Sequence, residues 1–111
     1  MDTMLVIYVP CTGIEEAKKI GLSIMKTRLA PCYNILTDMQ SAAFWPPKIG
    51  EIEEVHTGAV LLLKSVKSKF SAIETEIKKL HSDTNPCIFA IDVSHVSKEY
   101  YNWLVSEMES V

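Results

Sequence analysis

The pattern of apolar and polar positions first marks two segments, residues 5–9 and 59–63, in which no charged residue interrupts a run of mainly apolar side chains. Uninterrupted runs of this length are typical of strands that are buried on both faces of a sheet. We therefore predict two central strands at these positions. A third strand-like segment, residues 87–93, follows Pro86.

Two longer segments repeat their apolar residues with the period of an α-helix. Between residues 14 and 29 the apolar positions fall three or four apart, with glutamates and lysines between them, and the same period recurs over residues 67–81. These patterns predict two amphipathic helices. Thr12 and Glu15 have the spacing of a capping box that would begin the first helix. Pro31 would end it.

The chain between the first helix and the second apolar run is less regular. Residues 32–36 and 41–45 suit two strand segments, joined by a turn at Thr37-Asp38. Pro46-Pro47 breaks any strand at that point and begins a polar stretch that runs to about Gly58. This stretch fits either an irregular loop or an extension of a hairpin, and the pattern does not decide between them.

The elements follow the order strand–helix–strand–strand–helix–strand, and a C-terminal helix follows, for which Ser97 is the N-cap candidate. This order predicts an α+β, ferredoxin-like split βαβ sandwich (βαββαβ) with an extra C-terminal helix. In that topology the first and last strands are antiparallel neighbours, and both long helices cover one face of the sheet. The other face must then meet a third helix, water or another subunit. Because the central strands are apolar on both sides, the pattern favours association with another subunit.

Composition and charge limit the class of protein. The chain has 111 residues, of which 48% are hydrophobic and 23% charged, so we expect one globular domain over residues 1–111. The net charge is −3, with acids and bases interleaved, which gives no electrostatic support for binding nucleic acid. The first apolar run is too short to cross a membrane. Three widely spaced cysteines do not form a disulfide framework, so we expect a reducing, cytoplasmic location.

Three residues that could bind a metal fall near one end of the predicted sheet. Cys11 ends the first strand beside a helix N-terminus, His81 ends the second helix, and Cys87 opens the last strand. Because the first and last strands are antiparallel neighbours, these side chains could converge. Two thiolates and an imidazole would form a soft ligand set that suits Cu(I) or Zn(II). For Cys11 the alternative is a small residue packed in the core.

Sets of residues that indicate catalysis are absent from the sequence. It contains no glycine-rich phosphate loop, nucleophile elbow or Cys-x-x-Cys pair. His56 and His95 lie in polar segments and are expected at the surface, and Cys32 is expected to pack. We therefore expect a binding protein rather than an enzyme. A hydrolase that uses the Cys11 thiol as nucleophile is the remaining enzymatic alternative.

An ordered set of short motifs then gives the sequence a family likeness. They are Cys11-Thr12, the block from Arg28 to Ile35, Ser41 with Trp45, Leu63-Lys64-Ser65, Phe70 with Ile73, His81 with Pro86 and Ile88, and Tyr100 with Trp103-Leu104. In this order and with these gaps, the chain resembles the CutA family of divalent-cation tolerance proteins over residues 5–104. The resemblance implies a ferredoxin-like fold, a homotrimer whose sheets meet edge to edge, and a link to tolerance of copper and other divalent metals.

The sequence also departs from the family pattern. Ala43 stands where the family usually has a tyrosine, and Pro46-Pro47-Lys48-Ile49 inserts a few residues at the next turn. The segment that usually reads His-Pro-Tyr-Glu-x-Pro-Glu is here His81-Ser82-Asp83-Thr84-Asn85-Pro86-Cys87. The histidine and the second proline remain, whereas the tyrosine and both glutamates are replaced, so the chemistry of this region is expected to differ from that of the family.

Two other functions compete with metal binding. PII-like signalling trimers share the fold and bind small molecules in clefts between subunits, so a regulatory sensor of this kind is one alternative. A structural or adaptor trimer without a ligand is the other. Fold alone does not choose between them.

Overall fold

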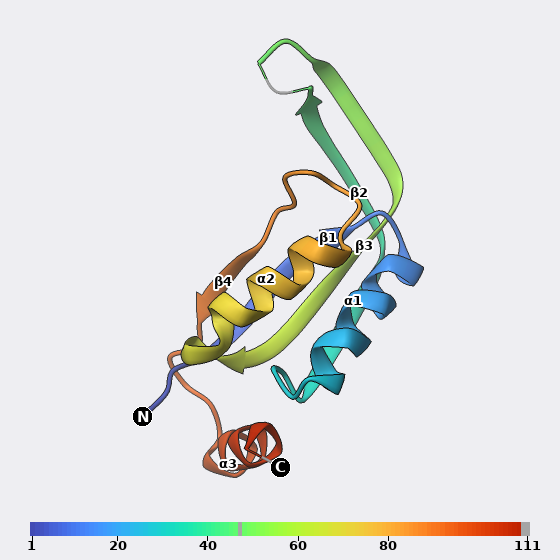
Figure 1. Cartoon of the computed structure of the whole chain (residues 1–111). Coiled ribbons are helices and arrows are strands. Elements are labelled where there is room, and N and C mark those ends of the chain that lie inside the picture. The colour runs from blue at the N-terminus through green and yellow to red at the C-terminus, as the bar shows by residue number, and fades with distance from the viewer. Residues whose placement is uncertain (47, 110–111) are drawn as a thin grey trace.

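The predicted sheet is present, and its strands are antiparallel throughout. In the computed structural model, which describes residues 1–46 and 48–109, four strands pair in the order β2-β3-β1-β4 (Figure 1). In chain order the elements are β1 (Met4–Cys11), α1 (Ile14–Lys26), β2 (Cys32–Trp45), β3 (Glu51–Val66), the 3-10 turn η1 (Lys67–Lys69), α2 (Phe70–Leu80), β4 (Phe89–Asp92) and α3 (Lys98–Met108). This order confirms the predicted ferredoxin-like α+β fold with an added C-terminal helix.

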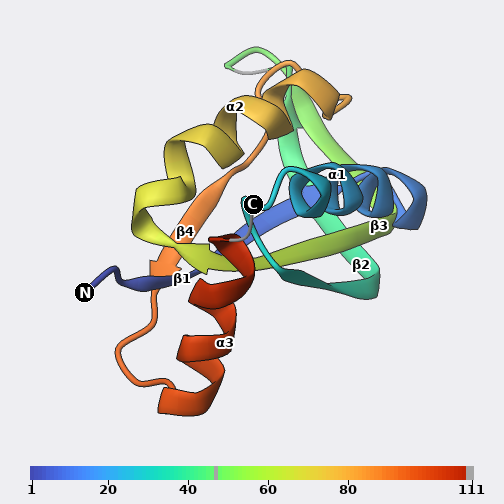
Figure 2. The same ribbon diagram turned by 60° about the horizontal axis from the view of Figure 1, so that its bottom comes forward.

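Helices α1 and α2 lie side by side on one face of the sheet, and the main core lies between them and the strands (Figures 1 and 2). Alternate residues of β1 point into this core, as the period of two requires. Each large aliphatic side chain buried there contributes roughly 1.5–3 kcal/mol. The largest fully buried side chains of this core are Ile7, Val9, Ile20, Ile24, Leu61, Leu63, Ile73 and Ile77.

The second strand differs from its prediction. The turn expected at Thr37-Asp38 is wrong, because β2 is one strand whose register against β3 shifts between Leu36 and Ser41. Asp38 has a φ of 59°, a left-handed conformation that aspartate tolerates better than most residues. The residue types that indicated a turn therefore mark a β-bulge.

The polar stretch after Pro46 forms the hairpin extension that was one of its two alternatives. Strand β3 begins at Glu51, which pairs with Trp45, and the pairing continues to Val55 opposite Ser41. Figure 1 shows this end of the hairpin as an arm that projects beyond the helices. Both faces of the arm are largely exposed, which explains why its sequence lacks an apolar period. Pro47 lies outside the described residues.

The last strand is shorter than predicted. Strand β4 covers residues 89–92 rather than 87–93, and it pairs with β1 from Tyr8 opposite Phe89 to Leu5 opposite Asp92. Helix α3 begins as expected, since the Ser97 side chain accepts a hydrogen bond from the Tyr100 amide. It packs in a second apolar cluster at the end of the sheet away from the arm (Figure 1); this cluster includes Met4, Val66, Leu104 and Met108.

The face of the sheet opposite α1 and α2 remains apolar in part. The ring of Tyr8 stacks on that of Phe89, with centroids 4.8 Å apart. Phe89 is 45% exposed and Ile91 57% exposed, and Leu36 is also exposed. None of the helices among the described residues is long and apolar enough to span a bilayer.

Candidate metal site

Cys11 is the last residue of β1, and its side chain points toward α1 and α2. The residue is 4% exposed, and its thiol lies 3.5 Å from the carbonyl oxygen of Val9, to which it donates a hydrogen bond. Burial, and then the nearby carboxylates of Glu16 and Asp83, raise the pKa of the Cys11 thiol to about 12. At neutral pH this cysteine is therefore a protonated thiol.

His81 follows α2 directly, and its ring is buried against the end of β1. The side chain is only 1% exposed. Nδ1 accepts a hydrogen bond of 3.0 Å from the backbone amide of Asp83, and Nε2 lies 2.8 Å from the carbonyl oxygen of Pro10. Because an amide can only donate, Nδ1 carries no proton in this arrangement. The ring is thus the neutral tautomer whose Nε2–H donates to Pro10.

Glu16, in the first turn of α1, is the third member of the cluster. Its Oε1 accepts hydrogen bonds from the amide (2.9 Å) and the hydroxyl (3.3 Å) of Thr12, and its Oε2 accepts one from the amide of Ser82 (2.8 Å). Burial favours the neutral acid, but the hydrogen bonds that the carboxylate accepts from Thr12 and Ser82 outweigh it and hold the pKa of Glu16 below its ordinary value. Glu16 is therefore a carboxylate at neutral pH.

The predicted capping box is offset by one residue. The helix begins at Ile14 after Gly13, and no side chain caps it in the usual way. The glutamate that reaches back to the Thr12 amide is Glu16, whereas Glu15 is exposed. The predicted capping box of Thr12 and Glu15 is therefore wrong about the glutamate. An acidic side chain does accept a hydrogen bond from the Thr12 amide, but it is that of Glu16.

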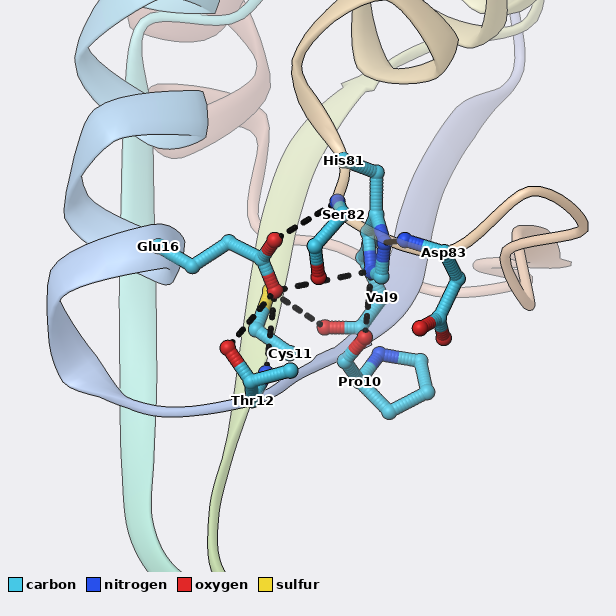
Figure 3. Close-up of polar contacts among 8 residues, drawn as sticks. All are labelled: Val9, Pro10, Cys11, Thr12, Glu16, His81, Ser82 and Asp83. Carbon is cyan, nitrogen blue, oxygen red and sulfur yellow. Dashed lines mark hydrogen bonds and ion pairs between the residues drawn. The ribbon is translucent and has the colours of Figure 1, made fainter.

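The three side chains converge from three elements (Figure 3). One ligand atom from each of Cys11, Glu16 and His81 lies within 4.8 Å of the others, and Nε2 of His81 is 3.9 Å from Oε1 of Glu16. No buried side-chain nitrogen or oxygen within the described residues lacks a hydrogen-bond partner. A thiol, a carboxylate and an imidazole are a donor set that suits Zn(II) or copper. The three residues therefore have the chemistry to bind a metal. In this structure the side chains of Glu16 and His81 are engaged in hydrogen bonds instead.

Cys87, the third residue of the predicted set, is not part of this cluster. It is exposed and precedes β4 by two residues. The register of β4, continued to residue 87, would place Cys87 opposite Pro10 rather than Cys11. Side chains one residue apart on a strand point to opposite faces, so Cys87 would face away from the helices. The sequence prediction correctly placed the last strand beside the first, but it overlooked the alternation of side chains along each strand.

Glu16 is the residue that sequence reasoning missed. The sequence places Glu16 directly after Glu15, and the prediction gave a role at the helix start to Glu15 alone. The other predicted surface and packing residues lie as expected: His56 and His95 are exposed, and Cys32 is half-buried with its sulfur 3.3 Å from the Tyr100 hydroxyl. Burial, and then the contact with Cys32, raise the pKa of Tyr100 to about 12.

The geometry does not favour a nucleophilic thiol. A pKa of about 12 leaves Cys11 protonated, and nucleophilic cysteines need a lowered pKa or an adjacent base. The unprotonated nitrogen of His81 faces the Asp83 amide rather than the thiol. The arrangement therefore supports ligand binding better than the hydrolase alternative.

Comparisons with known proteins agree with the fold and identify the family to which the chain belongs. The family model described as CutA1 divalent ion tolerance protein matches residues 5–107. The divalent-cation tolerance protein CutA of Archaeoglobus fulgidus is 33% identical over 103 residues, which cover 93% of this chain and 96% of that protein. That of Pyrococcus horikoshii is 34% identical over 104 residues, or 94% and 97% of the two chains.

Solved structures give the same result. The structure of the periplasmic divalent cation tolerance protein CutA from Archaeoglobus fulgidus superposes with a TM-score of 0.88 at 32% identity, covering 96% of this chain and 99% of that one. The divalent cation tolerance protein (Cut A1) from Thermus thermophilus gives 0.83 at 30% identity, with 91% and 94% covered. The chain therefore belongs to the CutA1 family of divalent ion tolerance proteins.

Proposed function

We propose that this protein binds a divalent or soft transition-metal ion, with copper and zinc as the candidates, at Cys11, Glu16 and His81, and that it does so as a homotrimer without catalysing a reaction. One observation carries the metal site: three different ligand types from three elements lie within 4.8 Å of one another at a buried position. The names of its relatives, which are divalent-cation tolerance proteins, support the same function.

The geometry of the cluster indicates what binding requires. Ligand atoms of a tetrahedral zinc, at bond lengths of about 2.0–2.3 Å, lie roughly 3–4 Å apart. The ligand atoms of the cluster, which extend over up to 4.8 Å, must therefore draw together by about 1 Å. The thiol must also lose its proton, which the metal displaces into solvent. Cys11 and His81 favour Cu(I), Cu(II) or Zn(II), and the carboxylate of Glu16 favours the divalent ions among them.

A titration of the reduced, metal-free protein with Zn(II) and with Cu(I), each against a competing chelator, tests the site. We expect one metal per chain, at least tenfold weaker binding in Cys11→Ser, and a smaller loss in Glu16→Gln. Cys87→Ser is the matched control, because it removes an exposed thiol outside the cluster. Binding that survives in Cys11→Ser, or that disappears in Cys87→Ser, would contradict the assignment.

The homotrimer is proposed from the surfaces that one chain leaves open. The sheet face with Phe89 and Ile91 is apolar and exposed, and β2 and β4 are edge strands. Exposed apolar faces and free edges are the features that association between subunits covers. Light scattering after size-exclusion chromatography should give three chains, and Ile91→Lys should reduce this number. Leu22→Lys, which changes an exposed apolar residue on α1, is the control.

The cytoplasm remains the proposed location. The three cysteines are free thiols in the structure, as a reducing compartment maintains. The CutA of Archaeoglobus fulgidus, a relative of known structure, is described as periplasmic. Fractionation of cells that express the full-length gene, with compartment markers, would decide it.

A further inference from the structure

The atoms that would bind a metal also hold the segment after α2 in place. Residues 82–86 leave α2 without regular structure, and Ser82, Asp83, Thr84 and Asn85 are exposed. The segment is fastened at its start by two backbone amides. The Ser82 amide donates to Oε2 of Glu16 at 2.8 Å, and the Asp83 amide donates to Nδ1 of His81 at 3.0 Å (Figure 3).

His81 has no nitrogen lone pair to spare in this state. Nδ1 uses its lone pair to accept from Asp83, and Nε2 carries the proton that it donates to Pro10. A metal can bind Nδ1 only by replacing the Asp83 amide. It can bind Nε2 of a neutral ring only after the proton has moved through solvent to Nδ1, and a protonated Nδ1 cannot accept from Asp83. Either route breaks the hydrogen bond to Asp83.

Glu16 sets no such condition. A carboxylate offers about four lone-pair positions, so it can bind a metal and still accept from Ser82. The conflict is therefore specific to His81 and Asp83. The site is also closed to solvent, since the side chains of His81 and Glu16 are only 1% and 11% exposed. A metal ion can therefore reach them only if part of the surrounding chain moves.

We propose that metal binding at His81 and the hydrogen bond from the Asp83 amide to His81 exclude each other, so that this bond acts as a latch on the segment 82–86 that opens when the metal binds. This inference rests on the proposed metal site. The ring stays neutral, its proton moves from Nε2 to Nδ1 or remains on Nε2 according to the nitrogen that binds, and the thiol proton of Cys11 leaves to solvent.

Amide hydrogen exchange of the full-length protein, with and without saturating Zn(II), tests the latch. We expect the Asp83 amide to exchange about tenfold faster or more with zinc bound, while amides in β1 and β3 keep their protection. Nitrogen chemical shifts of His81 should show the change of tautomer if Nε2 is the ligand. In Cys11→Ser, at a zinc concentration that loads the wild type but not this weaker-binding variant, the exchange of Asp83 should stay unchanged.

The reciprocal experiment removes the latch. Asp83→Pro deletes the amide proton, whereas Asp83→Ala deletes only the carboxylate, so both variants lose the carboxylate and only the first loses the hydrogen bond. Asp83→Pro should bind zinc roughly three- to tenfold more tightly than Asp83→Ala, because one hydrogen bond no longer competes. Zinc that binds stoichiometrically with no change at Asp83, and with equal affinity in the two variants, overturns the latch but leaves the metal site. Failure of zinc to bind overturns both.

Discussion

The carboxylate of Glu16 gives the sharpest prediction about stability, because its three hydrogen bonds connect α1, the end of β1 and the segment after α2. In Glu16→Gln the amide oxygen can still accept from Thr12, but the amide nitrogen then faces the Ser82 amide, and two donors oppose each other. Hydrogen bonds to a charged group contribute roughly 1.5–3 kcal/mol, and an exposed amide such as that of Ser82 recovers part of the loss from water. We expect Glu16→Gln to lower the free energy of unfolding by about 2 kcal/mol.

Glu15→Gln is the matched control. It removes the same charge from the same helical turn, but its side chain is exposed. It should lose only the interaction with the helix dipole, roughly 0.3–1 kcal/mol. Urea denaturation followed by circular dichroism, at one protein concentration because association shifts the midpoint, measures both variants.

The effect of pH distinguishes the carboxylate from a purely steric change. The pKa of Glu16 is lower in the folded protein than its ordinary value of 4.5. Its ionisation therefore contributes stability that is fully present above pH 4.5 and is lost as the pH falls through the folded pKa. The difference between wild type and Glu16→Gln should be largest near neutral pH and shrink in acid. Equal losses of unfolding free energy in Glu16→Gln and Glu15→Gln would refute this account of Glu16. So would a difference between wild type and Glu16→Gln that does not change with pH.

Three further predictions concern the core and the thiols. Leu61→Ala, at a fully buried position of β3, should cost about 2–5 kcal/mol in urea denaturation, and a loss under about 1 kcal/mol would contradict its place in the core. Gly21→Ala would bring a methyl group within 2.7 Å of the Tyr33 ring; we expect a net loss of about 1 kcal/mol in the same assay, because overpacking outweighs the gain in helix propensity. Alkylation at pH 8, followed by mass spectrometry, should modify the exposed Cys87 well before Cys11, since a pKa of about 12 leaves roughly one Cys11 thiol in ten thousand ionised; equal rates would contradict the burial of Cys11.

The sequence predicted those parts of the fold whose residues carry a clear hydrophobic pattern, either a continuous apolar run or a helical period. The uninterrupted apolar run of β3 and the helical spacing of α1 and α2 reflect burial, and burial is what the fold requires at those positions. The hairpin arm lacked such a signal because both of its faces are largely exposed. The bulge at Asp38 was mistaken for a turn, since both use residues that tolerate a left-handed backbone.

The candidate site was predicted in part for a different reason. Topology alone brings the end of β1 to the end of α2, which placed Cys11 near His81. Which third side chain joins them depends on the register of β4 against β1 and on the residue at which α1 begins. A shift of one residue in either changes the answer. Cys87 falls out of the set because a strand alternates its faces, and Glu16 replaces it because α1 begins at Ile14 and turns this residue inward. Errors of one residue are within the usual uncertainty of predicted boundaries, yet they decide the ligands of a site.

The backbone amide of Ser82 makes one of the two bonds that hold the segment after α2 against the candidate site. The segment resembles one in which a proline usually follows the histidine, and proline has no amide proton. In this chain Ser82 stands at that position, and its amide donates to Oε2 of Glu16 at 2.8 Å. A proline at position 82 could not make this bond. The Ser82 amide therefore ties the segment after α2 to the carboxylate of the site, while the Asp83 amide, which any residue except proline supplies, ties the segment to His81. The side chains of residues 82–85 are exposed, so the two bonds that close the site come from the backbone of the segment.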